Sequence, residues 1–185
     1  MAIDLGINQD YFANPPVQVT GLDEMGVGVP ADVRNGNLTK LTYAINIYQP
    51  QYLKELLGSD LYDAFEAGLQ ENPVPAKWTA LSDKLRDDTT KISPIANYIF
   101  FNALRDWRHV YSGIGASDNK ADNSNPVSVT PLQVNAWNVG VPLSVAIAEW
   151  LIANSETYEV DDICYPTALE WDASEIFEYK NRFDI

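Results

Sequence analysis

Residues 93–111 read SPIANYIFFNALRDWRHVY and are the clearest helical segment in the chain. Ser93 can cap the first turn, and Pro94 suits the first helical position, where no N–H is needed. On a helical wheel the apolar side chains share one wide arc: Ile95, Ala96, Ile99, Ala103, Leu104, Trp107, Val110 and Tyr111. The polar arc holds Asn97, Asn102, Arg105, Arg108 and His109, and with them the aromatics Tyr98 and Phe101. We predict a central helix to about Tyr111 whose two polar-arc aromatics make a second contact, for which a partner inside the same domain is favoured.

Capping residues and prolines predict further helices on both sides of this segment. They are expected to begin after Asn37, at Pro50, after Ser59, at residue 76 and at Pro131, with breaks or kinks at Gly58, Gly140 and Pro142. The apolar stripes place one shared set of side chains in the core: Leu57, Leu61, Phe65, Trp78, Leu81, Ile99, Leu104, Trp107 and Trp137. The expected fold is mainly α, a small bundle of about four to six helices with room for a few short strands.

Three segments lack helical periodicity and frame this body of residues 38–153. Residues 1–37 are expected to form an extended arm, residues 112–130 a long loop, and residues 154–185 an acidic tail with a short helix at about 168–179. The arm and the loop carry apolar residues, so we expect them to become ordered across neighbouring subunits or another protein. The expected interface residues are Tyr11, Phe12, Val17, Val19, Ile114, Val127 and Val129, with Tyr98 and Phe101 from the central helix.

Composition restricts the class of protein. The chain has 185 residues, 46% of them hydrophobic, which predicts one folded domain. Acidic residues outnumber basic ones 26 to 12, and the net charge of −14 with no Lys/Arg cluster argues against contiguous nucleic-acid binding. Residues 155–185 alone carry nine acids against Lys180 and Arg182, a net of −7. No apolar run approaches the ~20 residues of a membrane helix, and no signal peptide is visible, so we expect no membrane partner.

The residues that commonly carry chemistry are sparse. His109 is the one histidine and Cys164 the one cysteine, and the acids beside Cys164 would raise the pKa of its thiol. Residues 118–125 superficially resemble a calcium loop but place Lys120 where a ligand belongs. Asp87-Asp88 and Asp161-Asp162 are weak evidence for a glycosidase in so acidic a protein. We therefore expect no enzymatic activity, no cofactor and no structural metal.

Several motifs resemble one family of small helical proteins. The longest is Tyr48-Gln49-Pro50-Gln51-Tyr52-Leu53-Lys54-Glu55-Leu56-Leu57-Gly58-Ser59-Asp60-Leu61-Tyr62. Others are Lys77-Trp78-Thr79-Ala80-Leu81, the long aromatic helix, Gly113-Ile114-Gly115 with the Asn-rich Lys120–Asn125, and Asn135-Ala136-Trp137-Asn138. Together, over about residues 38–150, they resemble head–tail connector (adaptor or head-completion) proteins of tailed phages and prophages of Bacteroidetes.

The resemblance implies a structural role in the virion neck, with assembly in the host cytoplasm. Such a protein forms a ring under the portal, usually of twelve copies, and contacts itself, the portal protein and the next neck or tail protein, while DNA passes through without specific binding. Other assignments stay open at this point: another neck or tail-completion protein, a cellular helical binding module, and, with least support, a carbohydrate-active enzyme.

Overall fold

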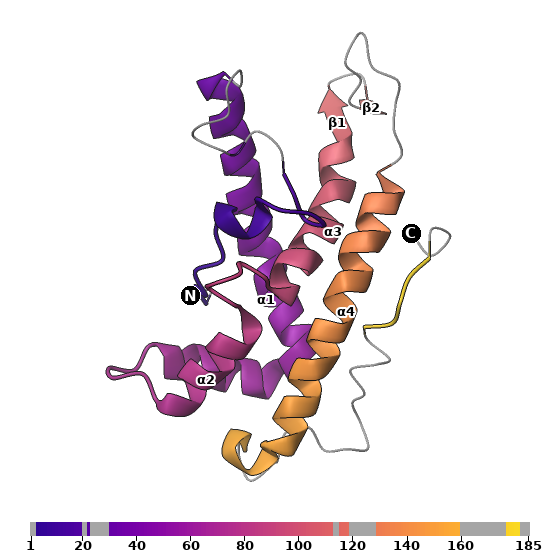
Figure 1. Cartoon of the computed structure of the whole chain (residues 1–185). Coiled ribbons are helices and arrows are strands. Elements are labelled where there is room, and N and C mark those ends of the chain that lie inside the picture. Colours follow the sequence, from indigo (N-terminus) through magenta and orange to yellow (C-terminus); the bar gives the residue numbers. More distant parts are fainter. Residues whose placement is uncertain are drawn as a thin grey trace.

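The structure, a computed structural model, describes residues 3–19, 22, 30–112, 115–118, 129–159 and 177–181, without the side chains of 108–112 and 115–118. It is mainly helical, as predicted (Figure 1). In chain order the elements are η1 (Gln9–Phe12), α1 (Ala31–Leu69), α2 (Ala76–Leu85), α3 (Pro94–Arg108), β1 (His109–Ser112), β2 (Gly115–Asp118), α4 (Thr130–Ala153) and η2 (Ser155–Tyr158). The two η elements are single turns of 3₁₀ helix.

The helices α3 and α4 lie side by side and run in opposite directions (Figure 1). Gln133 Nε2 in α4 donates a hydrogen bond to the Phe101 carbonyl in α3 at 2.9 Å. Further along α4, Gly140 lies close to Asn97, which precedes Phe101 in α3. A glycine at position 140 permits this approach, because a Cβ there would lie 2.9 Å from the Asn97 Cβ. This pair, with α1 packed on α3, forms the centre of the bundle.

The start signal of α3 is confirmed, and its end differs from the prediction. Ser93 Oγ accepts a hydrogen bond from the Ile95 N–H at 3.2 Å and donates one to the Leu85 carbonyl at 2.8 Å. The helix ends at Arg108, and His109–Ser112 pairs with Gly115–Asp118 as an antiparallel hairpin. Regular structure therefore enters the stretch predicted to be an irregular loop. The β-branched and aromatic residues after Arg108 favour extended backbone over a longer helix.

Helix α1 is longer than predicted and absorbs three expected segments. It begins at Ala31 and continues through Pro50 to Leu69, with one break in helical geometry at Gly58 (φ 72°, ψ 168°). The predicted stop at Gly58 is thus confirmed as a sharp change of direction inside α1. The left-handed φ explains why glycine stands there, since a Cβ would be strained in this conformation.

The N-terminal segment (residues 3–19) packs on the body, which differs from the extended arm that we predicted. Its apolar side chains enter the main core: Ile3, Leu5, Ile7, Tyr11, Phe12 and Val17 are all buried. Tyr11 also donates a hydrogen bond to Asp88 Oδ1 at 2.7 Å, and Arg86 donates to the Leu5 carbonyl. Frequent glycines and prolines hid this packing, because a buried segment without regular structure has no periodicity to detect.

Most predicted core residues lie in the core, with two exceptions. Leu104 and Trp107, near the end of α3, are only partly buried. Asn97 was predicted on the polar arc but is 4% exposed, because α4 covers that side of α3. Residues 177–179 are not helical, which corrects the predicted helix at 168–179 over these three positions; the rest of it lies outside the described residues.

Helix α4 is the most apolar described element, with a mean hydropathy of 1.4 over its best 18-residue window. By length and composition it could cross a membrane, but the core helix of a soluble protein passes the same test. Its inner face packs on α3 and on the aromatic core, and 39% of that window is buried within the chain.

Candidate interaction surfaces

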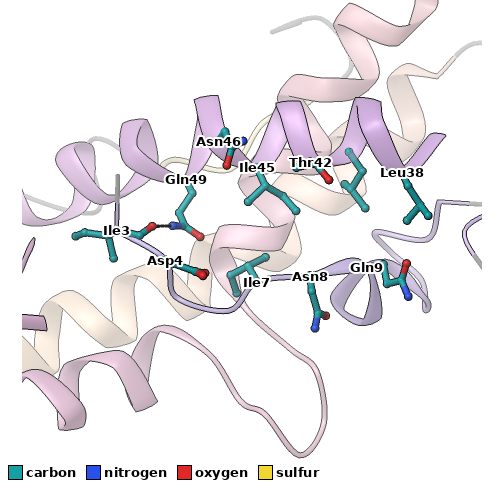
Figure 2. A pocket seen from close by; sticks show the side chains of 11 residues that line it. Ile3, Asp4, Ile7, Asn8, Gln9, Leu38, Thr42, Ile45, Asn46 and Gln49 are labelled. Atoms are coloured by element: carbon teal, nitrogen blue, oxygen red, sulfur yellow. Dashed lines mark hydrogen bonds between the residues drawn. The ribbon is translucent and has the colours of Figure 1, made fainter. Parts of the chain in front are cut away.

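A groove of about 470 Å³ lies between the N-terminal segment and the first half of α1 (Figure 2). One wall consists of residues at helical spacing on one face of α1: Leu38, Leu41, Thr42, Ile45, Asn46 and Gln49. The other wall consists of Ile3, Asp4, Ile7, Asn8 and Gln9. Gln49 Nε2 donates to the Ile3 carbonyl and closes the groove at one end.

The groove is lined almost entirely by uncharged side chains. Asp4 is the one ionisable side chain among its lining residues, and Asp4 Oδ1 already accepts the Gly6 N–H at 2.8 Å. The described lining places no second ionisable side chain beside it. The groove's lining combines aliphatic side chains with amide and hydroxyl groups and the Asp4 carboxylate, a mixture that is compatible with an apolar side chain presented by another segment.

The outward face of α4 is a second candidate surface. The helix buries its inner positions and exposes a line of residues spaced three and four apart: Leu132, Asn135, Val139, Pro142, Ala146, Glu149 and Ala153. Leu132 is 52% exposed and Val139 39% exposed. Glu149 is the one charged residue in the 24 residues of α4, although 21% of the whole chain is charged. With exposed aliphatic side chains and a single charge, this face is a candidate contact surface.

The structure places three predicted interface residues inside the subunit. Tyr11, Phe12 and Val17 are buried in its own core, so in this conformation no neighbour could contact them. Burial raises the pKa of the Tyr11 hydroxyl, and its hydrogen bond to Asp88 acts in the same direction. The same bond lowers the pKa of Asp88. These three residues fix the N-terminal segment instead of presenting it.

The second contact expected for Tyr98 and Phe101 lies within the chain. Tyr98 donates a hydrogen bond to Glu55 Oε1 at 2.7 Å, and the Phe101 ring lies 4.7 Å from that of Trp137. Burial raises the pKa of Tyr98, and the Glu55 carboxylate raises it further. Both aromatic side chains of the polar arc therefore already have partners within the chain, Tyr98 on α1 and Phe101 on α4.

The remaining predicted interface residues are divided between the surface and the part not described. Val19 is half-buried and lines a second hollow of about 290 Å³ with Phe100, Leu104 and Trp107. Val129 precedes α4, where its carbonyl accepts the Leu132 and Gln133 N–H groups at 3.0 Å. Ile114 and Val127 lie outside the described residues.

The pair Asp87-Asp88 lies in an exposed turn, between α2 and α3. Asp87 accepts hydrogen bonds from the backbone and hydroxyl of Thr90, which lower its pKa, and Asp88 accepts from Tyr11 and Lys91. Both carboxylates thus stabilise the turn. Within the described ranges, no three His, Cys, Asp or Glu side chains are close enough to hold a metal ion. Asp161-Asp162, Cys164 and residues 119–125 of the calcium-like stretch lie outside those ranges.

No family model, no curated protein and no solved structure matches the chain.

Proposed function

We propose that this chain is a structural protein of a tailed-phage neck, a head–tail connector that forms a ring under the portal and links capsid to tail. The proposal joins the motif resemblance of residues 38–150 to one structural observation, the outward face of α4, on which Glu149 is the one charged residue. The partners would be other copies of the chain, the portal protein and the next neck or tail protein. DNA would pass through without specific binding, and the protein would act in the virion after assembly in the host cytoplasm.

The motif residues bend and pack the helices of this fold, which supports a structural role. Gly58 bends α1, Trp78 packs between Phe65 and Tyr158, and Trp137 lies among Tyr98 and Phe101. The described surfaces offer grooves for apolar side chains, as an assembly protein needs.

The face of α4 supports self-association because of the net charge. Copies of a chain with a net charge of −14 repel one another, and repulsion is weakest where the meeting surfaces carry no charge. A contact through Leu132, Val139 and Pro142 would bury apolar area at little electrostatic cost. Around a ring each subunit would present this face to a different surface on its neighbour, as head-to-tail contacts require.

The test is the oligomeric state of the purified chain, alone and mixed with a portal protein from a Bacteroidetes phage. Native mass measurement and negative-stain imaging should reveal a closed ring, alone or on the portal. A chain that stays monomeric or dimeric in both conditions would favour the cellular binding module. A ring that binds a tail-tube end and not the portal would favour a tail-completion protein.

A further inference from the structure

The C-terminal segment (Phe177–Asn181) lies in extended form against α4 and is held there mainly by side chains of the body. Asn138 Nδ2 donates to the Lys180 carbonyl at 2.9 Å, and the Lys180 N–H donates to Asn138 Oδ1 at 2.8 Å. One carboxamide thus satisfies both backbone groups of Lys180, as a neighbouring strand would. The contact recognises extended backbone, whichever chain supplies it.

Trp137 adds two further contacts to the same segment. Its indole Nε1 donates to the Glu178 carbonyl at 2.7 Å, and its ring lies 4.8 Å from Lys180 Nζ. The first contact reads the backbone and the second favours a cation at the fourth position of the segment. The sequence Asn135–Asn138 therefore contributes a receptor as well as core packing.

An aromatic pocket holds the side chain at the first position of the segment, Phe177. Phe177 is 3% exposed, with its ring centroid 5.6 Å from that of Tyr52 and 6.3 Å from that of Trp137. Tyr179 is 67% exposed and contributes little to the contact. The combined preference is for an extended segment with a buried aromatic residue followed three positions later by lysine.

The chain that joins this segment to the body is longer than the return path requires. From Ala153 back to Trp137 is 16 residues of helix, about 24 Å at 1.5 Å per residue. Residues 160–176 could span up to about 58 Å if fully extended. The number of linking residues thus leaves length to spare for a segment that would bind the equivalent site of an adjacent copy.

We propose that Trp137, Asn138 and the Phe177 pocket form a peptide-recognition site that takes the C-terminal segment of a second copy of the chain. In a dilute subunit the chain's own segment fills the site, because covalent linkage gives it the advantage over a segment of a separate, distant copy. When copies are held side by side, the neighbour's segment competes with it and links the two. The inference needs only two copies and does not depend on the proposed ring.

The test pairs two full-length variants that are complementary. Phe177→Ala weakens the segment and leaves the site intact, and Asn138→Ala weakens the site and leaves the segment intact. Mixed and examined by native mass spectrometry, they should form mixed dimers well above the statistical share, with the Phe177→Ala chain accepting the other chain's segment. The control mixes Tyr179→Ala with Asn138→Ala. It should give no excess of mixed dimers, because the C-terminal segment of the Tyr179→Ala chain still fills that chain's own site.

A peptide measurement keeps the proposal falsifiable if a variant folds poorly. A labelled peptide with the sequence of residues 174–183, titrated onto the full-length Phe177→Ala chain, should bind saturably. The same peptide with alanine in place of Phe177 should bind to that chain at least about 30-fold more weakly. Mixed dimers at no more than the statistical share would overturn the exchange between copies. Equal binding of the two peptides, or no binding of either, would overturn the recognition site itself.

Discussion

Two glycines of α1 show that the consequence of a missing side chain depends on its neighbours. A Cβ at Gly68 would collide with the indole of Trp78, which lies directly against the helix there. A Cβ at Gly36, in the exposed first turns of the same helix, would meet nothing within 4 Å. The first glycine is required by packing, and the second only lowers helix propensity.

Alanine at these two positions should therefore change stability in opposite directions. Gly68→Ala should lower the free energy of unfolding by about 1–3 kcal/mol, because the indole must move in a packed core. Gly36→Ala should raise it by up to about 1 kcal/mol, through better helix propensity and a less flexible unfolded chain. Urea unfolding followed by circular dichroism measures both. A loss at position 36 as large as that at 68 would contradict this packing.

Tyrosine–carboxylate bonds between α1 and α3 make stability depend on alkaline pH. Tyr48 donates to Asp106, and burial together with this bond raises the pKa of Tyr48 to about 12, from an ordinary value of 10.0. Above pH 10 the unfolded chain loses the phenolic proton while the folded chain keeps it, so deprotonation favours unfolding. This contribution to stability is complete below about pH 10 and is lost as the pH rises towards 12.

The free energy of unfolding should accordingly decline between about pH 10 and pH 12, and Tyr48→Phe should make the decline shallower. The size of the difference is reduced by solvent screening, because Tyr48 is only half-buried. Urea midpoints at about pH 9 and pH 11 for both proteins provide the measurement. Tyr43→Phe, at an exposed position of the same helix, is the matched control. Parallel pH profiles for the wild type and Tyr48→Phe would refute the assignment.

Among the elements, the N-terminal segment departs most from its sequence interpretation. Leu5 and Phe12 stand in a stretch rich in Gly, Pro and Asn, a composition typical of an exposed arm. In the structure Asn8 caps the turn η1 through the Asp10 N–H at 3.0 Å, which directs Tyr11 and Phe12 into the core. The glycines, prolines and asparagines indicated irregular backbone correctly. Irregular backbone can still be buried, however, when helices from other parts of the chain surround it.

Phe12→Ala therefore belongs with the core substitutions and should cost about 3–5 kcal/mol in the free energy of unfolding, because Phe12 is fully buried. An arm that is ordered only by a neighbouring subunit would lose almost nothing in the isolated chain. Tyr43→Ala, which removes a 69% exposed aromatic from α1, is the control and should cost less than about 0.5 kcal/mol. A small effect at Phe12 would restore the prediction of an extended arm that becomes ordered only on a neighbouring subunit or another protein.

Sequence patterns predicted helices well where a local signal suffices. Ser93-Pro94 marks the start of α3, and Gly58 the bend in α1, because both effects involve only adjacent backbone. The helical wheel failed at Asn97, since α3 is contacted on more than one side and has no simple solvent-exposed face. The groove could not be predicted, because its two walls meet only through tertiary packing of residues 3–9 on α1.

At the scale of the molecule, charge and apolar surface are separated. The chain carries a net charge of −14, whereas α4 presents an almost uncharged outward face. The low charge is visible in the sequence, because Glu149 is the one charged residue among the 24 residues of α4. Only the structure shows which positions of this helix point outwards. In the proposed self-association, attraction through that face would compete with a general repulsion that dissolved salt can screen.

Self-association of the chain should consequently strengthen as ionic strength rises. Between about 0.01 M and 0.15 M salt the screening length falls from about 30 Å to about 8 Å, which removes most repulsion between acidic surfaces but leaves the apolar contact intact. Val139→Asp should abolish association at both salt concentrations with little effect on unfolding, because Val139 is 39% exposed and a charge there remains hydrated. Thr39→Asp, at an exposed position on α1, adds the same charge away from the face and should leave association nearly unchanged. Sedimentation velocity on the three proteins resolves the outcome. If association weakens with salt, charge pairs and not the face of α4 hold the copies together, and equal losses in both variants would assign the effect to net charge alone.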